Sequence, residues 1–205
     1  MRSILNLPVA DFITATAAKH PTPGGGSVAA LCGALAASLA TMALRYTVGK
    51  KAYADYDAVL NAAIAELQNA ATLFQQLITE DITAYENLSA MLKLPEPQRL
   101  ANPNYTTAVV AAIRAPHTTA ALAAATLDRC LALLDKTNKF LISDLAIAAT
   151  YAHATVHASE FNVRINLPLL PNQEEAATLR QNLTDLATKA DNTYETIRSH
   201  MLKIL

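Results

Sequence analysis

The sequence contains little charge and little sulfur, and it has no tryptophan. Charged residues make up 16% of its 205 positions and the formal net charge is −1. It has no basic block, so it lacks the cationic face that non-specific nucleic-acid binding needs. Its two cysteines, Cys32 and Cys130, are far apart and fit no metal-ligand spacing. We therefore expect a cytoplasmic protein with two free buried thiols and no nucleic-acid partner.

Long, strongly apolar runs are also scarce. Pro8 and Asp11 interrupt the N-terminal segment, which therefore lacks the apolar core of a signal peptide. The uncharged run from Val28 to Leu44 is a little short for a membrane span and consists mostly of small, weakly hydrophobic residues. We expect this run to form a buried central helix and the protein to have no membrane segment.

Alanine dominates the sequence, and 52% of the residues are hydrophobic. That is enough apolar surface for a large core in a single domain spanning residues 1–205. An alanine-rich composition favours closely packed helices, so we predict an all-α fold: a multi-helix bundle with one long central helix. The patterns predict helices over 8–18, 27–48, 55–94, 105–113, 116–134, 144–159 and 174–205, with a break near the middle of 55–94 left open.

Two short segments between the predicted helices have patterns of their own. Gly49 follows the second predicted helix and can provide its left-handed cap. Residues 161–167, FNVRINL, alternate apolar and polar side chains and predict a short extended segment.

A carboxylate interrupts the apolar stripe of the long predicted helix. The stripe has the alternating three- and four-residue spacing of packed helices, and Asp81 is its only charged member. A carboxylate on a buried face must be paired, hydrogen-bonded or protonated, which suits a pocket acid or base for proton transfer. The alternative is that the helix breaks here and Asp81 caps a second helix. The stripe comprises Tyr56, Leu60, Ala63, Leu67, Ala70, Phe74, Leu77, Asp81, Ala84, Leu88 and Met91.

Three of the five glycines stand together in PTPGGGSVAAL, at the start of the most apolar predicted helix. Free N–H groups at a helix N-terminus suit an anion or a polarised carbonyl group. The motif is not a phosphate-binding Walker loop, because no Gly-Lys-Ser/Thr follows, and no strand precedes it as a dinucleotide fingerprint requires. A tight turn that lets two helices pack closely remains an equal alternative.

Lys50 and Lys51 could hold a polyanionic tail, although an isolated basic pair more often forms a solvated turn. Ser143 and Asp144 fit a helix N-cap and a first-turn acid, and could also face a site at that helix start.

His153 and His157 lie one helical turn apart, with Glu160 three residues further along. This spacing could bind zinc, but the zinc-protease pattern HExxH is absent and a solvated polar face is the favoured interpretation. Asn162 and Asn166 can each donate and accept hydrogen bonds, as recognition of a heterocyclic ligand requires.

Four segments in order resemble one known family, the formimidoyltetrahydrofolate cyclodeaminases and methenyltetrahydrofolate cyclohydrolases. They are PTPGGGSVAAL (21–31), GKKAY (49–53), EDITAY…KLP (80–95) and SDLAIAA…FNVRINL (143–167). The resemblance covers nearly the whole chain and includes the C-terminal domain of formiminotransferase-cyclodeaminase. It leaves no room for a formiminotransferase domain in this chain.

The resemblance implies an all-helical homodimer that acts on a folate substrate without a metal or a cofactor. It implies that Asp81 is the catalytic acid/base, because the family's D-x-x-A-Phe/Tyr setting matches Asp81, Ala84 and Tyr85. Lys50 and Lys51 would then suit the glutamate tail of a polyglutamylated folate. The residues implied to line the folate cleft are Pro23, Gly24, Gly25, Gly26, Ser27, Ser143, Asp144, Asn162 and Asn166.

One segment departs from the family pattern. After Leu94-Pro95 the family often carries Lys and a charged stretch, whereas this chain has Glu96 and the short loop PQRLANPN. The resemblance therefore implies a one-carbon folate enzyme without choosing between cyclodeaminase and cyclohydrolase. A folate-binding or helical interaction protein without catalysis is the alternative from another functional class.

Overall fold

The fold is an antiparallel bundle of long helices, described here for residues 4–204 of a computed structural model. No strand occurs within that range, so the predicted all-α class is confirmed. Short 3-10 turns precede or follow several of the helices. The α-helices are α1 (Val9–Ala17), α2 (Gly25–Arg45), α3 (Asp57–Leu92), α4 (Glu96–Ala101), α5 (Tyr105–Leu133), α6 (Ile142–Asn166) and α7 (Gln173–Ile204).

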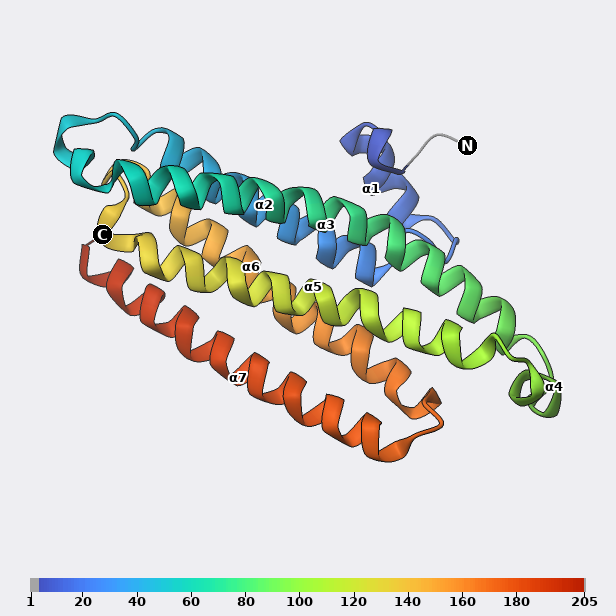
Figure 1. Cartoon of the computed structure of the whole chain (residues 1–205). Coiled ribbons are helices and arrows are strands. Elements are labelled where there is room, and N and C mark those ends of the chain that lie inside the picture. Colours follow the sequence, from blue (N-terminus) through green and yellow to red (C-terminus); the bar gives the residue numbers. More distant parts are fainter. Residues whose placement is uncertain (1–3, 205) are drawn as a thin grey trace.

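Helices α2, α3, α5, α6 and α7 run side by side, while the short α1 and α4 lie at the periphery (Figure 1). One buried cluster joins residues of all five long helices, and a second joins α3, α5, α6 and α7 near the end that carries α4. The longest helix, α3, extends past the first residue of α2. This difference in length opens a gap in the bundle where α2 begins.

Helices α2 and α3 approach closely because α2 presents small residues to its neighbour. Gly33 faces the ring of Phe74, and a methyl group added at Gly33 would overlap that ring. Phe74 is completely buried, so this contact lies in the centre of the core. Glycine and alanine on α2 therefore allow the large side chains of α3 to fill the space between the helices.

The stripe on the long helix is confirmed as a buried face. Eight of its ten apolar members are buried, and the two exceptions, Tyr56 and Met91, stand at its ends. Helix α3 continues without interruption through Asp81. The alternative in which the helix breaks and Asp81 caps a second helix is therefore wrong.

The extended segment predicted for 161–167 is wrong, because these residues complete α6 and begin a 3-10 turn. Val163 and Leu167 are fully buried, whereas Phe161 and Ile165 are 72% and 74% exposed. Buried positions four residues apart are a helical pattern, and two exposed apolar residues made it look like strand alternation.

The predicted break between 113 and 116 is also wrong, since α5 runs through Pro116. Proline removes one backbone hydrogen bond inside a helix, and the bundle compensates for that loss by a contact described below. Gly49 does adopt the left-handed conformation, with φ of 77°, but α2 ends at Arg45 and Tyr46 caps it, so the predicted capping role of Gly49 is wrong. The last predicted helix is confirmed as α7, and Leu205 lies outside the described residues.

Two helical stretches, Gly25–Arg45 and Tyr105–Lys136, are long and apolar enough to cross a membrane by length and composition. More than half of each apolar window is buried inside the bundle, as expected for core helices. The absence of a membrane segment stays a prediction.

Candidate active site

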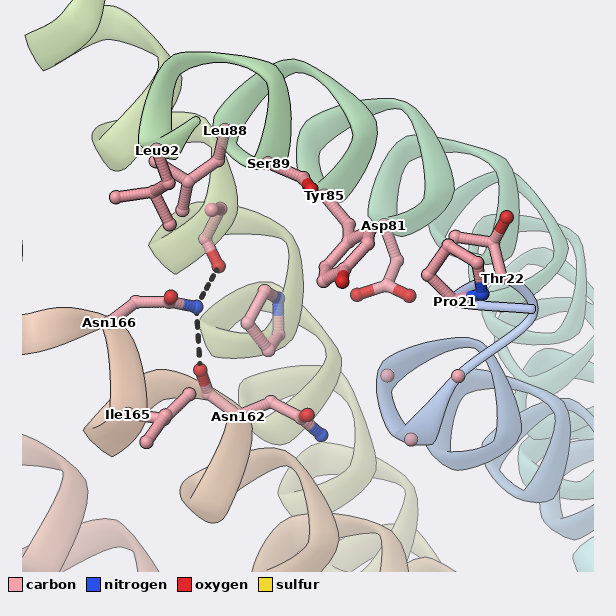
Figure 2. A pocket seen from close by; sticks show the side chains of 15 residues that line it. Pro21, Thr22, Asp81, Tyr85, Leu88, Ser89, Leu92, Asn162, Ile165 and Asn166 are labelled. Atoms are coloured by element: carbon pink, nitrogen blue, oxygen red, sulfur yellow. Dashed lines mark hydrogen bonds between the residues drawn. The ribbon is translucent and has the colours of Figure 1, made fainter. Parts of the chain in front are cut away.

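A cavity of about 300 Å³ lies where α2 begins, between α2, α3, α5 and α6. Figure 2 shows Asp81 and Tyr85 projecting into it from α3, opposite Asn162 and Asn166 of α6. Its volume is at the lower end of the range of small-molecule sites. The lining residues are Pro21, Thr22, Gly24, Gly25, Gly26, Asp81, Tyr85, Leu88, Ser89, Leu92, Ala112, Pro116, Asn162, Ile165 and Asn166.

Asp81 is held at the start of α2 by Ser27. The Ser27 hydroxyl donates a hydrogen bond of 2.9 Å to Oδ2 of Asp81, and the Ser27 backbone N–H donates to the same carboxylate. The positive end of the helix dipole also favours a carboxylate at this position. The first turn of α2 therefore receives an anion, as its sequence allowed, but the anion is a side chain of the protein itself.

Burial is the largest influence on the pKa of the Asp81 carboxyl. Desolvation raises the pKa of this carboxyl above its ordinary value, and the two hydrogen bonds from Ser27 oppose the rise without cancelling it. A carboxyl with a raised pKa accepts a proton more readily than an ordinary carboxyl and can return it, which suits general acid–base catalysis.

Gly26 is required for this arrangement. A methyl group at Gly26 would overlap the Asp81 carboxylate, so only glycine leaves room for the side chain at the helix start. Gly25 lies near the Asn162 side chain, where a methyl group would stand 3.4 Å from Oδ1. The glycine triplet thus allows side chains of α3 and α6 to lie close to the backbone of α2. Both alternatives from the sequence are therefore partly correct: the helix start accepts an anion, and the glycines permit close packing.

Asn166 closes the gap that Pro116 leaves in α5. Pro116 has no N–H to donate to the carbonyl of Ala112, and Nδ2 of Asn166 donates to that oxygen instead at 3.2 Å. The same nitrogen donates to the carbonyl of Asn162 at 3.0 Å, and both bonds are drawn in Figure 2. A proline and an asparagine on different helices therefore fix the wall of the cavity together.

Replacing Asn166 by aspartate should destabilise the protein at neutral pH. The variant would place a carboxylate against two carbonyl oxygens, and losing a buried donor costs ~1–3 kcal/mol. We expect the melting temperature to fall by about 2–4 °C for each kcal/mol, measured by circular dichroism. The deficit should shrink at low pH, where a protonated aspartate can donate again. Asn192→Asp, at an exposed position of α7, is the matched control, and equal melting temperatures for the two variants would contradict this assignment.

The structure brings together most, but not all, of the residues predicted for the site. Gly24, Gly25, Gly26, Asp81, Asn162 and Asn166 line the cavity. Ser27 is buried and contacts Asp81. Pro23 is buried directly before the glycines and does not line the cavity, and the peptide bond that precedes it is cis.

Ser143 and Asp144 lie at the other end of the bundle, so their predicted place in one cleft with Asp81 is wrong within one chain. Lys50 and Lys51, predicted to suit the glutamate tail, lie at that far end as well. Helix α2 separates the basic pair from the glycines by about 30 Å, and Asp144 lies about 27 Å before Asn162 along α6. Figure 1 shows the α2–α3 and α5–α6 connections together at that end. There the backbone N–H of Lys139 donates to the Tyr53 hydroxyl, which joins the two connections.

Several lining residues were not predicted as site residues, although Tyr85 belongs to the motif around Asp81 and Leu88 to the apolar stripe. Tyr85, Leu88, Ser89 and Leu92 follow Asp81 on one face of α3, so the helical period identifies them once Asp81 is chosen. Ala112 and Pro116 come from α5, whose approach to this point is a property of the bundle.

The chain matches known proteins over nearly its whole length. Residues 8–185 match the family described as formiminotransferase-cyclodeaminase. A methenyltetrahydrofolate cyclohydrolase of Methylorubrum extorquens is 26% identical over 202 residues, which cover 95% of this chain and 97% of that protein. The formimidoyltransferase-cyclodeaminase of Sus scrofa is 29% identical over 197 residues, and the match spans 92% of this chain but only 36% of that longer protein.

A solved structure shows the same fold. The formiminotetrahydrofolate cyclodeaminase of Thermotoga maritima superimposes with a TM-score of 0.83 at 26% sequence identity, over 99% of this chain and 98% of that one. The family match covers far more than half of the sequence, and both the helical architecture and the motif order agree with it. This chain is therefore a member of the formiminotransferase-cyclodeaminase family.

Proposed function

We propose that the protein is a one-carbon folate enzyme whose site is the cavity around Asp81. The observation that carries this proposal is the charge of the cavity: among the described residues that line it, Asp81 alone is charged. The one-carbon unit in both reactions named for its relatives is an amidine-type carbon between nitrogens, which bears positive charge. A single half-buried carboxylate complements that charge and can also move a proton.

In the cyclodeaminase reaction, which we propose first, the folate's side-chain nitrogen attacks the carbon of the protonated formimino group, and this bond closes the ring. The tetrahedral carbon that forms carries three nitrogens. Asp81 takes the proton from the attacking nitrogen and returns it to the amino group, which leaves as ammonia. The product is the 5,10-methenyl cation, and Asp81 ends as the carboxylate with which it began.

Water would be the nucleophile in a cyclohydrolase. It attacks the methenyl carbon, and Asp81 accepts one of its protons. Asp81 returns this proton to the ring nitrogen that leaves, the remaining hydroxyl proton passes to solvent, and the tetrahedral carbon opens to a formylated folate. The Methylorubrum relative, which is named as a cyclohydrolase, supports this second candidate, while the Thermotoga structure supports the first with equally complete coverage of both chains. Both reactions pass through a tetrahedral carbon between the same two nitrogens, so one cavity serves either.

Absorbance of the methenyl group separates the two reactions. The purified protein is incubated with 5-formiminotetrahydrofolate and, separately, with 5,10-methenyltetrahydrofolate. A gain of absorbance from the first substrate identifies a cyclodeaminase, and a loss from the second beyond the spontaneous rate identifies a cyclohydrolase. Folate binding without either change would support the non-catalytic alternative and contradict the proposal.

Removing the Ser27 hydroxyl should move the acidic limb of the pH–rate profile. That hydroxyl stabilises the carboxylate form of Asp81, so Ser27→Ala should raise the pKa of Asp81 further. A general base works in its ionised form, so activity is lost as pH falls through its pKa. We expect the acidic limb of kcat/KM to lie at higher pH in Ser27→Ala than in the wild type.

Ser89→Ala is the control for that profile, because Ser89 lines the same cavity from α3. Its profile should overlay that of the wild type. An unshifted limb in Ser27→Ala would contradict the role given to Asp81 as the titrating group.

The protein is proposed to be a cytoplasmic homodimer that needs no metal or cofactor, because addition to the one-carbon unit and collapse of the tetrahedral carbon require only proton transfer from a protein side chain. Supporting the dimer, α1 has no buried residue in a single chain, and Val9 and Ile13 are exposed on it. Phe161 and Ile165 also expose apolar surface beside the cavity. Light scattering after size exclusion should give the mass of two chains.

A polyglutamylated substrate stays a prediction, since Lys50 and Lys51 lie far from the cavity of their own chain.

A further inference from the structure

A second group of functional side chains lies between α6 and α7, away from the folate cavity. His153 and His157 stand one turn apart on α6, and Asp191 faces both from α7. Nε2 of His153 lies 2.7 Å from Oδ1 of Asp191, and Nε2 of His157 lies 2.8 Å from the same oxygen. The two Nε2 atoms are 3.2 Å apart. The sequence pattern contained the histidines but not the aspartate that completes the group.

These separations bring three possible ligand atoms close enough to surround one ion. Nitrogen and oxygen ligands bound at about 2.0–2.1 Å lie about 2.9 Å apart at right angles and about 3.3 Å apart in a tetrahedron. The 3.2 Å between the two Nε2 atoms lies within that range, whereas the 2.7 and 2.8 Å separations from Oδ1 are hydrogen-bond lengths that must widen slightly when an ion binds. Two imidazoles and one carboxylate are typical ligands of first-row divalent metals, and the exposed side of Asp191 leaves room for water at the remaining positions.

The hydrogen bonds of His157 leave a place for an ion. Nδ1 of His157 faces Oε2 of Glu160 at 3.4 Å, while its Nε2 faces Asp191. A neutral imidazole has one N–H and can donate to only one of these carboxylates, so the other nitrogen must carry either a second proton or a metal ion. A metal ion at Nε2 would leave the proton on Nδ1 for Glu160, which is the carboxylate–histidine–metal arrangement found around metal sites.

The surroundings of the two histidines hold them in place. Glu160, with a side chain only 15% exposed, accepts a hydrogen bond of 2.7 Å from Nε of Arg164. The ring of Tyr194 stacks on His153 with centroids 4.5 Å apart and planes 12° from parallel. Such support fixes the orientation of the ligands before an ion arrives.

We propose that His153, His157 and Asp191 bind a divalent transition metal ion of the zinc type, which clamps α7 to α6. The site is separate from the folate cavity and takes no part in the proposed reaction. Its occupation should raise the melting temperature, because an ion that binds only the folded chain stabilises it.

The test uses the full chain without an affinity tag, stripped with EDTA and dialysed. Titration with ZnCl2 is followed by calorimetry, and titration with CoCl2 by its visible absorption. We expect one equivalent to bind to the wild type and the melting temperature to rise with ZnCl2. Glu160→Gln should weaken binding by about 10–100-fold without removing a ligand. His153→Asn and His157→Asn should abolish the saturable binding.

His200→Asn is the matched control. His200 also lies near one aspartate, with Nε2 at 3.6 Å from Asp135, but no second histidine shares that aspartate. This variant should bind the metal as the wild type does. Failure of the wild type to bind either ion, or equal binding by wild type and His157→Asn, would overturn the proposal.

Discussion

Replacing Asp81 by asparagine should reduce kcat by at least 10²–10⁴-fold, the contribution typical of a positioned acid or base. The amide has the same shape and can still accept hydrogen bonds from Ser27, so the cavity should keep its form. It cannot take the proton from the attacking nitrogen or water. The methenyl absorbance assay, run at saturating substrate, measures this loss. Glu80→Gln, one residue earlier on the exposed face of α3, should keep wild-type activity.

The same substitution should not lower the melting temperature at neutral pH. Because burial raises the pKa of Asp81, the ionised carboxylate is less favourable in the folded protein than in the unfolded chain. Stability linked to this group is therefore greatest below the pKa of the unfolded chain and is lost as pH rises through the raised pKa of the folded chain. An amide removes that loss. An inactive Asp81→Asn variant that melts well below the wild type would show a structural defect and contradict the catalytic role.

Replacing Gly26 by alanine should abolish most activity while leaving the fold stable. The added methyl group would occupy the place of the Asp81 carboxylate, which can rotate away because it ends a flexible side chain. A displacement of about 1 Å at a reacting group can cost about 10²-fold in rate. Alanine also favours a helix over glycine by ~1 kcal/mol, so the melting temperature should not fall. Steady-state kinetics and thermal melts on one preparation measure both effects.

Gly33→Ala on the same helix should show the opposite pattern. Its methyl group would meet the buried ring of Phe74, which cannot move aside, and overpacking of this kind costs ~1–3 kcal/mol. Its folded molecules should keep their activity. Equal losses of stability and of activity in the two variants would contradict the separate roles assigned to these glycines.

The helical period of α3 and its misplaced carboxylate could be read from the sequence, because both are local. Asp81 stands out where every neighbour on its face is apolar, and the bundle confirms that this face is buried. The glycine triplet could be read only as two alternatives. The side chain that approaches the triplet is determined by how α2 and α3 align along their lengths. This alignment cannot be predicted from the sequence of either helix alone.

The predictions that were wrong or incomplete depend on contacts between helices that are far apart in the sequence. In the sequence Pro116 predicts a helix boundary, but in the structure Asn166 of α6 donates the hydrogen bond that Pro116 cannot, and α5 continues. Ser143 and Asp144 belong to the same sequence motif as Asn162. The motif covers nearly all of the 25-residue helix α6, so its first and last residues lie at opposite ends of the bundle. Asp191 was missed because only the packing of α7 on α6 brings it to the histidines.

A crystal structure of Asp81→Asn with 5,10-methenyltetrahydrofolate tests the central claim most directly. The slow variant keeps the ligand intact, and its position can be seen. The proposed site predicts that the ring system fills the cavity between α2, α3 and α6, with the methenyl carbon within about 3–3.5 Å of the side chain at position 81 or of a water held by it. Folate bound instead at the far end of the bundle, beside Lys50 and Asp144, would contradict it.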